Sequence, residues 1–143
     1  MFKMSRIHLF RTEVADKPGG TAAKLKALAE AGAHLEYVYS ERSSTSSGIG
    51  ALYVAPRQTK AEEDLVKKVG LKAVEEPIVM RFEGDDKSGL GSRVTAAWET
   101  AGINLHGLMM AVLSGRFVGY ATFDTVMDAN SAATILAEIG AKE

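Results

Sequence analysis

Two short loops hold the residue types in this sequence that could bind a small charged molecule. The first is the run Asp16-Lys17-Pro18-Gly19-Gly20, and the second extends from Gly84 through Asp85, Asp86, Lys87 and Ser88 to Gly89. Each loop precedes a predicted helix, whose N-terminal N–H groups attract an anion, and glycine lets that anion approach the backbone. The neighbouring carboxylates could accept hydrogen bonds from an ammonium group. Each loop therefore offers partners for both ends of a zwitterion.

A purely structural interpretation of the same loops is also open. Asp16 and Asp86 could be N-terminal capping residues, with the glycines only making the turn. Lys17 and Lys87 could assist a ligand carboxylate or simply be solvated. A phosphate loop is excluded for the second run, because it lacks the Gly-Lys-Ser/Thr ending and its acids would repel phosphate.

Residues for catalysis or metal binding are sparse. The chain has no cysteine, and its three histidines, His8, His34 and His106, are far apart in sequence. No serine is accompanied by a recognisable base, so no nucleophile is indicated. We therefore expect no catalytic residue, no metal site and no cofactor, and we predict that the protein is not an enzyme.

Composition and charge narrow the class of protein further. The 143 residues are 46% hydrophobic and 24% charged, which is typical of a folded globular protein. With 17 Lys+Arg against 18 Asp+Glu, the net charge of −1 argues against nucleic acid as a partner. No apolar run is long enough to span a membrane, and the first residues do not resemble a signal peptide. We expect a cytoplasmic protein without a membrane partner.

The loops belong to a repeated unit. Residues 16–37 match residues 86–107 at an offset of 70, with seven of 22 positions identical, which include Asp16/Asp86, Gly19/Gly89 and Gly32/Gly102. Two copies of about 70 residues are therefore predicted, a first unit over 1–75 and a second over 76–143. Because so small a unit buries little surface, the copies should pack on each other or on a second chain.

Hydrophobic periodicity assigns the same order of elements to each copy. The first copy is predicted to hold strand 6–15, helix 21–31, strand 34–43, strand 49–55, helix 59–69 and strand 71–74. The second is predicted to hold strand 78–82, helix 90–101, strand 103–113, strand 116–123 and helix 127–139, with its last strand short or absent. This βαββαβ order predicts an α+β fold of two ferredoxin-like units, with helices on one face of antiparallel sheets.

One sheet face of the second copy is expected to need cover from a partner. Apolar residues occupy both alternating sets of strand 103–113, whereas helices can cover only one face. The set Leu108, Met110, Val112 and Tyr120 is assigned to the uncovered face. A homodimer or larger assembly is therefore expected.

The residues that begin each copy resemble the ACT domain. The loop Asp16 to Gly20, followed by Ala31-Gly32-Ala33-His34-Leu35, is similar to the ACT loop, helix and second-strand start, and Ala101-Gly102-Ile103-Asn104-Leu105 repeats the pattern. The resemblance covers nearly the whole chain, as a tandem pair without an attached enzyme. Two residues depart from it, Ser88 in place of the loop proline and Gly20 in place of an aliphatic residue.

The resemblance implies regulation by a small molecule, most often an amino acid, at interfaces between ACT units. It also implies the residues that line the site, which are Asp16, Lys17, Pro18, Gly19, Gly20 and His34 in copy one, and Asp85, Asp86, Lys87, Ser88, Gly89, Leu90 and Asn104 in copy two. The alternative function is a regulatory subunit that binds no ligand and associates with a metabolic enzyme.

Overall fold

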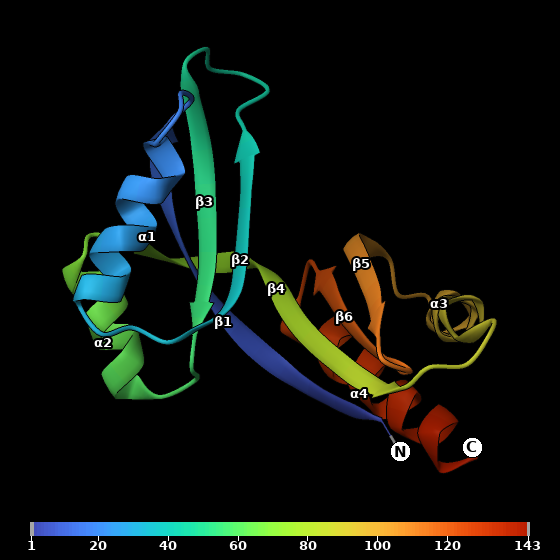
Figure 1. The fold of residues 1–143 in the computed structure, drawn as a ribbon. Helices are drawn as coiled ribbons and strands as arrows, with labels where there is room; N and C mark the ends of the chain where they lie inside the picture. The colour runs from blue at the N-terminus through green and yellow to red at the C-terminus, as the bar shows by residue number, and fades with distance from the viewer. Residues whose placement is uncertain (1, 143) are drawn as a thin grey trace. The chain divides into compact units, whose positions relative to one another are not determined.

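A computed structural model describes residues 2–142, which form two compact units (Figure 1). The N-terminal unit consists of residues 8–75. The C-terminal unit consists of residues 76–142 together with residues 2–7. The sequence predicts units over 1–75 and 76–143. The structure differs in that residues 2–7 belong to the C-terminal unit.

Ten helices and strands follow one another in the described residues. In chain order they are β1 (Lys3–Ala15), α1 (Gly20–Glu30), β2 (Leu35–Arg42), β3 (Ile49–Pro56), α2 (Lys60–Lys68), β4 (Lys72–Asp85), α3 (Leu90–Thr100), β5 (Leu105–Leu113), β6 (Arg116–Phe123) and α4 (Val126–Ala141). The order confirms the predicted pair of βαββαβ units, except at the joint between the copies.

Strand β4 replaces two strands that the sequence predicts as separate. Segments 71–74 and 78–82 are parts of one continuous strand, Lys72–Asp85. Residues 72–75 belong to the N-terminal unit and the rest of β4 to the C-terminal unit. Strand β1 is divided in the same way after Ile7, so both long strands contribute to both units.

This division explains how the C-terminal unit obtains its fourth strand. Hydrogen-bonded neighbours follow the order β2-β3-β1-β4-β6-β5. The N-terminal unit therefore has the order β2-β3-β1-β4 and the C-terminal unit the order β1-β4-β6-β5. Helix α4 continues to Ala141, past Gly140, so no strand follows it within residues 2–142. Residues 3–7 occupy the place in the sheet that a last strand of copy two would take.

The core of each unit lies between its sheet and its two helices. In the N-terminal unit, Leu28 of α1 and Val66 of α2 are buried against Phe10, Leu52 and Val54 of the strands. Burial of both helices in one cluster places them on the same face of the sheet, as predicted.

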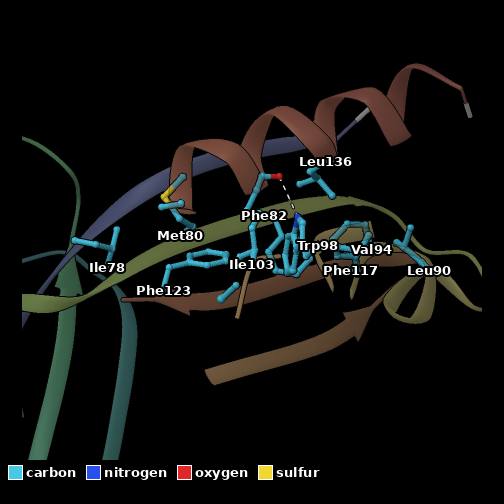
Figure 2. Close-up of a cluster of buried hydrophobic side chains, with 13 residues drawn as sticks. Ile78, Met80, Phe82, Leu90, Val94, Trp98, Ile103, Phe117, Phe123 and Leu136 are labelled. Atoms are coloured by element: carbon cyan, nitrogen blue, oxygen red, sulfur yellow. Dashed lines mark hydrogen bonds between the residues drawn. The ribbon is translucent and has the colours of Figure 1, made fainter. Parts of the chain in front are cut away.

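Trp98 organises the core of the C-terminal unit (Figure 2). Its ring lies edge-on to Phe82 and Phe123, with ring centroids 5.7 and 5.6 Å away. Its Nε1 donates a 3.1 Å hydrogen bond to the carbonyl oxygen of Ala132, drawn as a dashed line in Figure 2. One side chain of α3 thus contacts both the sheet and α4 and satisfies its polar atom while buried.

A bulge in β5 corrects the predicted faces of that strand. The pairing of β5 with β6 shifts between Leu105 and Gly107, so the alternation of side chains changes there. Leu108, Met110 and Val112 pair with Ala121, Gly119 and Phe117 respectively. Ala121 and Phe117 are core residues on the helix-covered face, and directly paired residues share a face.

Leu108, Met110 and Val112 consequently lie on the helix-covered side, and their assignment to the uncovered face is wrong. Met110 packs against the core. The uncovered face instead presents Met109 and Ala111, together with Tyr120, which pairs with Met109 and is the one member of the predicted set on that side. The error arises because the sequence prediction assumes that side chains alternate strictly along the whole strand. Across a bulge, this assumption assigns every later residue to the opposite face of the sheet.

Candidate functional site

The two candidate loops have the same backbone conformation. Gly19 and Gly89 are the N-caps of α1 and α3, with φ of +88° and +80°. This left-handed region favours glycine, which explains why both copies have glycine at this position. The loop with Ser88 in place of Pro18 adopts the same cap, so the proline is not needed to form it.

Hydrogen bonds at the loops repeat as well. The N–H of Gly20 donates to the carbonyl oxygen of Lys17, and the N–H of Leu90 donates to that of Lys87, both at 3.1 Å. The N–H of Asp16 donates to Gly48 and that of Asp86 to Gly115, so each loop is joined to the hairpin turn of its own unit. Loop residues 70 positions apart in the sequence therefore make equivalent backbone hydrogen bonds.

Asp16 and Asp86 do not cap the helices. The N-cap positions are glycines, and neither α1 nor α3 has a side-chain hydrogen bond at its cap. The second helix of each copy differs, because the side chains of Thr59 and Thr125 accept hydrogen bonds from Glu62 N–H and Asp128 N–H. The first helix of each copy therefore begins without the side-chain acceptor that the second helix has.

Two arginines that the sequence analysis missed contact the loop acids. Arg42 Nε donates to Asp16 Oδ2 at 2.7 Å, and Arg116 Nη1 donates to Asp85 Oδ1 at 2.7 Å. Each arginine lies at an end of a hairpin strand that is distant in sequence from its acid. Within residues 2–142, the Asp86 carboxylate has no ion pair. Asp86 is therefore the loop acid most available to a ligand ammonium group.

The residues that directly follow the two N-caps, Gly20 and Leu90, have different roles. A Cβ at Gly20 would lie 2.0 Å from the carbonyl oxygen of Ala15, so only glycine fits there. This contact is the physical reason for the departure from an aliphatic residue. Leu90 is 2% exposed and belongs to the core of the C-terminal unit, which makes its side chain a packing residue.

His34 and Asn104 lie away from the loops of their own units. They precede β2 and β5, beyond the C-terminal ends of α1 and α3. Each helix has eleven residues and so separates them from its N-terminal loop by about 16 Å. The structure groups Asp16 to Gly20 and Asp85 to Gly89 in two exposed loops, and it does not bring His34 or Asn104 to the loop of the same unit.

His34 instead connects β2 to α2. Its N–H donates to Glu62 Oε2 at 3.0 Å, and its Nδ1 lies 3.4 Å from Glu62 Oε1. The hydrogen bond from the backbone N–H of His34 is the largest cause of the lowered pKa of Glu62. This contact gives His34 a structural role within its unit.

Metal and membrane sites are not found in the part of the chain described. No group of three or more His, Asp or Glu side chains within residues 2–142 is arranged to hold a metal ion. None of the helices in that range combines the length and the apolar character that crossing a bilayer requires.

Solved structures with the same architecture include regulatory proteins. A protein of Bacteroides thetaiotaomicron superposes with a TM-score of 0.71 at 12% identity, over 96% of this chain and 90% of that one. The regulatory subunit of aspartate kinase from Thermus thermophilus has a TM-score of 0.59 at 17% identity, over 96% and 95% of the two chains. A structure of aspartokinase alpha and beta subunits gives 0.57 at 15% identity, over 96% and 95%.

The fold is α+β, with helices on one face of antiparallel strands in each unit. Two ferredoxin-like βαββαβ units in tandem are the arrangement that the sequence predicts, and the superposition with the Thermus regulatory subunit confirms it. No protein-family model matches this sequence, and no curated protein matches it either. Because one fold serves many functions, the function of this chain has to be argued from its own loops.

Proposed function

We propose that this chain is a regulatory protein, without catalytic activity of its own, that senses an amino acid through the loops at the start of α1 and α3. The observation that carries the proposal is the pair of uncapped first helices in a chain that caps both second helices with threonine. Backbone N–H groups at such an N-terminus, together with the macrodipole, favour a carboxylate.

Charged side chains around each loop could bind the ammonium group of a zwitterion and add a second contact to its carboxylate. Asp86 is an acceptor for an ammonium group, and Arg116, held beside it by Asp85, supplies a second positive group for the ligand carboxylate. The loop of copy one has Arg42 and Asp16 in an ion pair, so an ammonium group there has to share its acceptor with the guanidinium. We therefore favour copy two as the binding site.

The fold agrees with a regulatory role, since the structures that share it include a regulatory subunit of aspartate kinase. The alternative is a subunit that binds no ligand and regulates a metabolic enzyme by association alone. Exposed apolar side chains on the edge strands, among them Val38 and Leu108, are the observation in its favour.

A thermal-shift screen against the twenty amino acids separates the two functions. A ligand that binds only the native state stabilises it by about 2.7 kcal/mol at a concentration of 100 Kd. We expect one amino acid, or a group with related side chains, to raise the melting temperature in a concentration-dependent way. Absence of any shift at millimolar concentration would reject ligand sensing and leave the association function.

A further inference from the structure

The surface beside the first helix differs in chemistry between the two copies. On the helix-covered side of the edge strand, three alternate residues can be compared at the offset of 70. In copy one they are Val38, Ser40 and Arg42 of β2, and in copy two Leu108, Met110 and Val112 of β5. Both strands shift register at their start, so the positions remain equivalent in the structure. The set is mostly polar in copy one and entirely aliphatic in copy two.

The middle residue of each set lies beside the second residue of the first helix. In copy one, Thr21 Oγ1 lies 3.4 Å from Ser40 Oγ, which is a hydrogen-bonding distance between two hydroxyls. In copy two the equivalent helix residue is Gly91, and a Cβ there would lie 3.4 Å from Met110 Sδ. A flexible thioether side chain therefore covers the start of α3 where copy one has a polar pair.

The third residue of each set explains the difference between Asp16 and Asp86. Arg42 Nε donates to Asp16 Oδ2 at 2.7 Å. Val112 replaces this arginine in copy two, so within residues 2–142 the Asp86 carboxylate lacks the ion pair that Asp16 has. One pair of substitutions, Arg42 to Val112 and Ser40 to Met110, thus leaves a carboxylate without its arginine and surrounds the start of α3 with apolar groups.

The aliphatic side chains of copy two are accessible to a ligand. Leu108 and Val112 are 42% and 57% exposed, and Met110 is partly buried against the core of the C-terminal unit. A small molecule that covers these side chains removes apolar surface from water, which favours binding. The same molecule needs a positive group to reach Asp86.

We propose that copy two senses an amino acid with an aliphatic side chain, which packs on Met110 and Val112 while its ammonium group binds Asp86. The proposal rests on the proposed function and names the class of ligand that this function leaves open. A polar or charged side chain would lose hydration here without gaining a partner, because the hydroxyls and the arginine of copy one are replaced by aliphatic groups. The preferred ligands are therefore leucine, isoleucine, valine and methionine.

Calorimetric titration with L-leucine, L-alanine and L-lysine tests this preference. The three ligands share the ammonium and carboxylate groups, so differences in affinity report the side chain alone. We expect leucine to bind at least about 10-fold more tightly than alanine, since even one methylene group in an apolar site can be worth that factor. Lysine, whose side chain carries a charge, should bind no more tightly than alanine.

Two variants test the residues that hold the side chain. Val112→Ser alters an exposed residue that folding does not require, and it should weaken leucine binding by about 5-fold while alanine binding is unchanged. Gly91→Thr combined with Met110→Ser recreates the polar pair of copy one and should remove the preference for leucine over alanine. Met127→Ser is the matched control, because Met127 is 78% exposed on α4 of the same unit. Far-UV circular dichroism verifies that each variant is folded.

The outcomes separate this proposal from the proposed function. Equal affinities for leucine, alanine and lysine would overturn the aliphatic preference and leave amino-acid sensing in place. A preference for leucine that survives both in Val112→Ser and in the double variant would overturn the assignment to these residues. Absence of a thermal shift with all twenty amino acids would overturn the proposed function and this proposal together.

Discussion

The acidic side chains of the two loops differ in what they can still bind. Asp16 and Asp85 each accept a 2.7 Å hydrogen bond from an arginine, so their charges are already balanced. Asp86, adjacent to Asp85, has no such contact within residues 2–142. Two carboxylates that are neighbours in sequence therefore have different roles: one holds an arginine in place, and the other is available.

Asp86→Asn should weaken binding of the amino acid found in the thermal-shift screen by about 10- to 150-fold, because a charge-assisted hydrogen bond is worth about 1.5–3 kcal/mol. Calorimetric titration measures the affinity, and melting curves show whether the variant remains folded. Asp16→Asn, the equivalent change in copy one, should have the smaller effect. Unchanged affinity in both variants would contradict a role for these carboxylates in ligand binding.

We expect Glu62 to make the stability of the N-terminal unit depend on pH. The backbone N–H of His34 lowers the pKa of Glu62 below its ordinary value of 4.5. A group whose pKa is lowered by folding stabilises the native state above its unfolded pKa, and this contribution is lost as the pH falls through the folded value. Urea unfolding of wild type and Glu62→Gln should therefore differ near neutral pH and converge in acid.

His34→Ala provides the control for that experiment. It removes the imidazole contact with Glu62 but retains the backbone N–H, which is the largest cause of the shift. NMR titration should find the pKa of Glu62 still lowered in His34→Ala. A return of the pKa to its ordinary value would show that the side chain, and not the backbone, is the important donor.

At the scale of elements, the two first helices begin with the same backbone but pack differently. Gly20 directly follows the cap of α1, where an added Cβ would lie 2.0 Å from the carbonyl oxygen of Ala15. Leu90, at the same position of α3, belongs to the core of the C-terminal unit. The two copies therefore share the conformation of the loop but differ in how the first residue of the helix packs.

Gly20→Ala and Leu90→Ala should both destabilise the protein, for opposite reasons. The added methyl of the first cannot fit without a backbone shift, which costs about 1–3 kcal/mol. The second leaves a cavity and costs about 2–5 kcal/mol. Urea unfolding followed by circular dichroism measures both, and Trp98, the single tryptophan, reports the C-terminal unit by fluorescence. A neutral Gly20→Ala would show that the contact with Ala15 relaxes freely.

At the scale of the whole molecule, the C-terminal unit is discontinuous in sequence. Phe2 and Met4 pack against its core, and the Phe2 ring lies edge-on to Phe117 at 5.6 Å. Residues 8–75, in contrast, form the N-terminal unit from a single continuous segment. The first residues of the chain should therefore matter more to the distant copy than to the one that they precede.

Removal of residues 2–7 should destabilise the C-terminal unit by about 3 kcal/mol or more, since the burial of two large apolar side chains is lost. The fluorescence of Trp98 follows this loss, while amide exchange of residues 8–75 should change little. Joining residues 2–7 after residue 142 through a short linker should restore stability, because a Cβ at Gly140 would lie 3.2 Å from the Phe2 nitrogen. Failure of this permuted chain would reject the structural role of the segment.

Local features of the chain were predictable from the sequence. Helical and strand periodicity, the glycines with positive φ at the caps and the hairpin turn at Ser114-Gly115 depend on neighbouring residues. The repeat at 70 residues then predicted two equivalent loops, and the structure shows that they share one conformation. Local sequence therefore determined most of the elements, the fold class and the positions of the two loops.

The tertiary structure alone decided which distant residues meet. Asp16 pairs with Arg42 across 26 residues and Asp85 with Arg116 across 31, and neither pair leaves a periodic signal. Residues 3–7 join a unit that begins at residue 76, and a bulge at the start of β5 reverses the faces of Leu108 and its neighbours. These features depend on pairing between remote segments, whose energy is not encoded in the spacing of residues along any one of them.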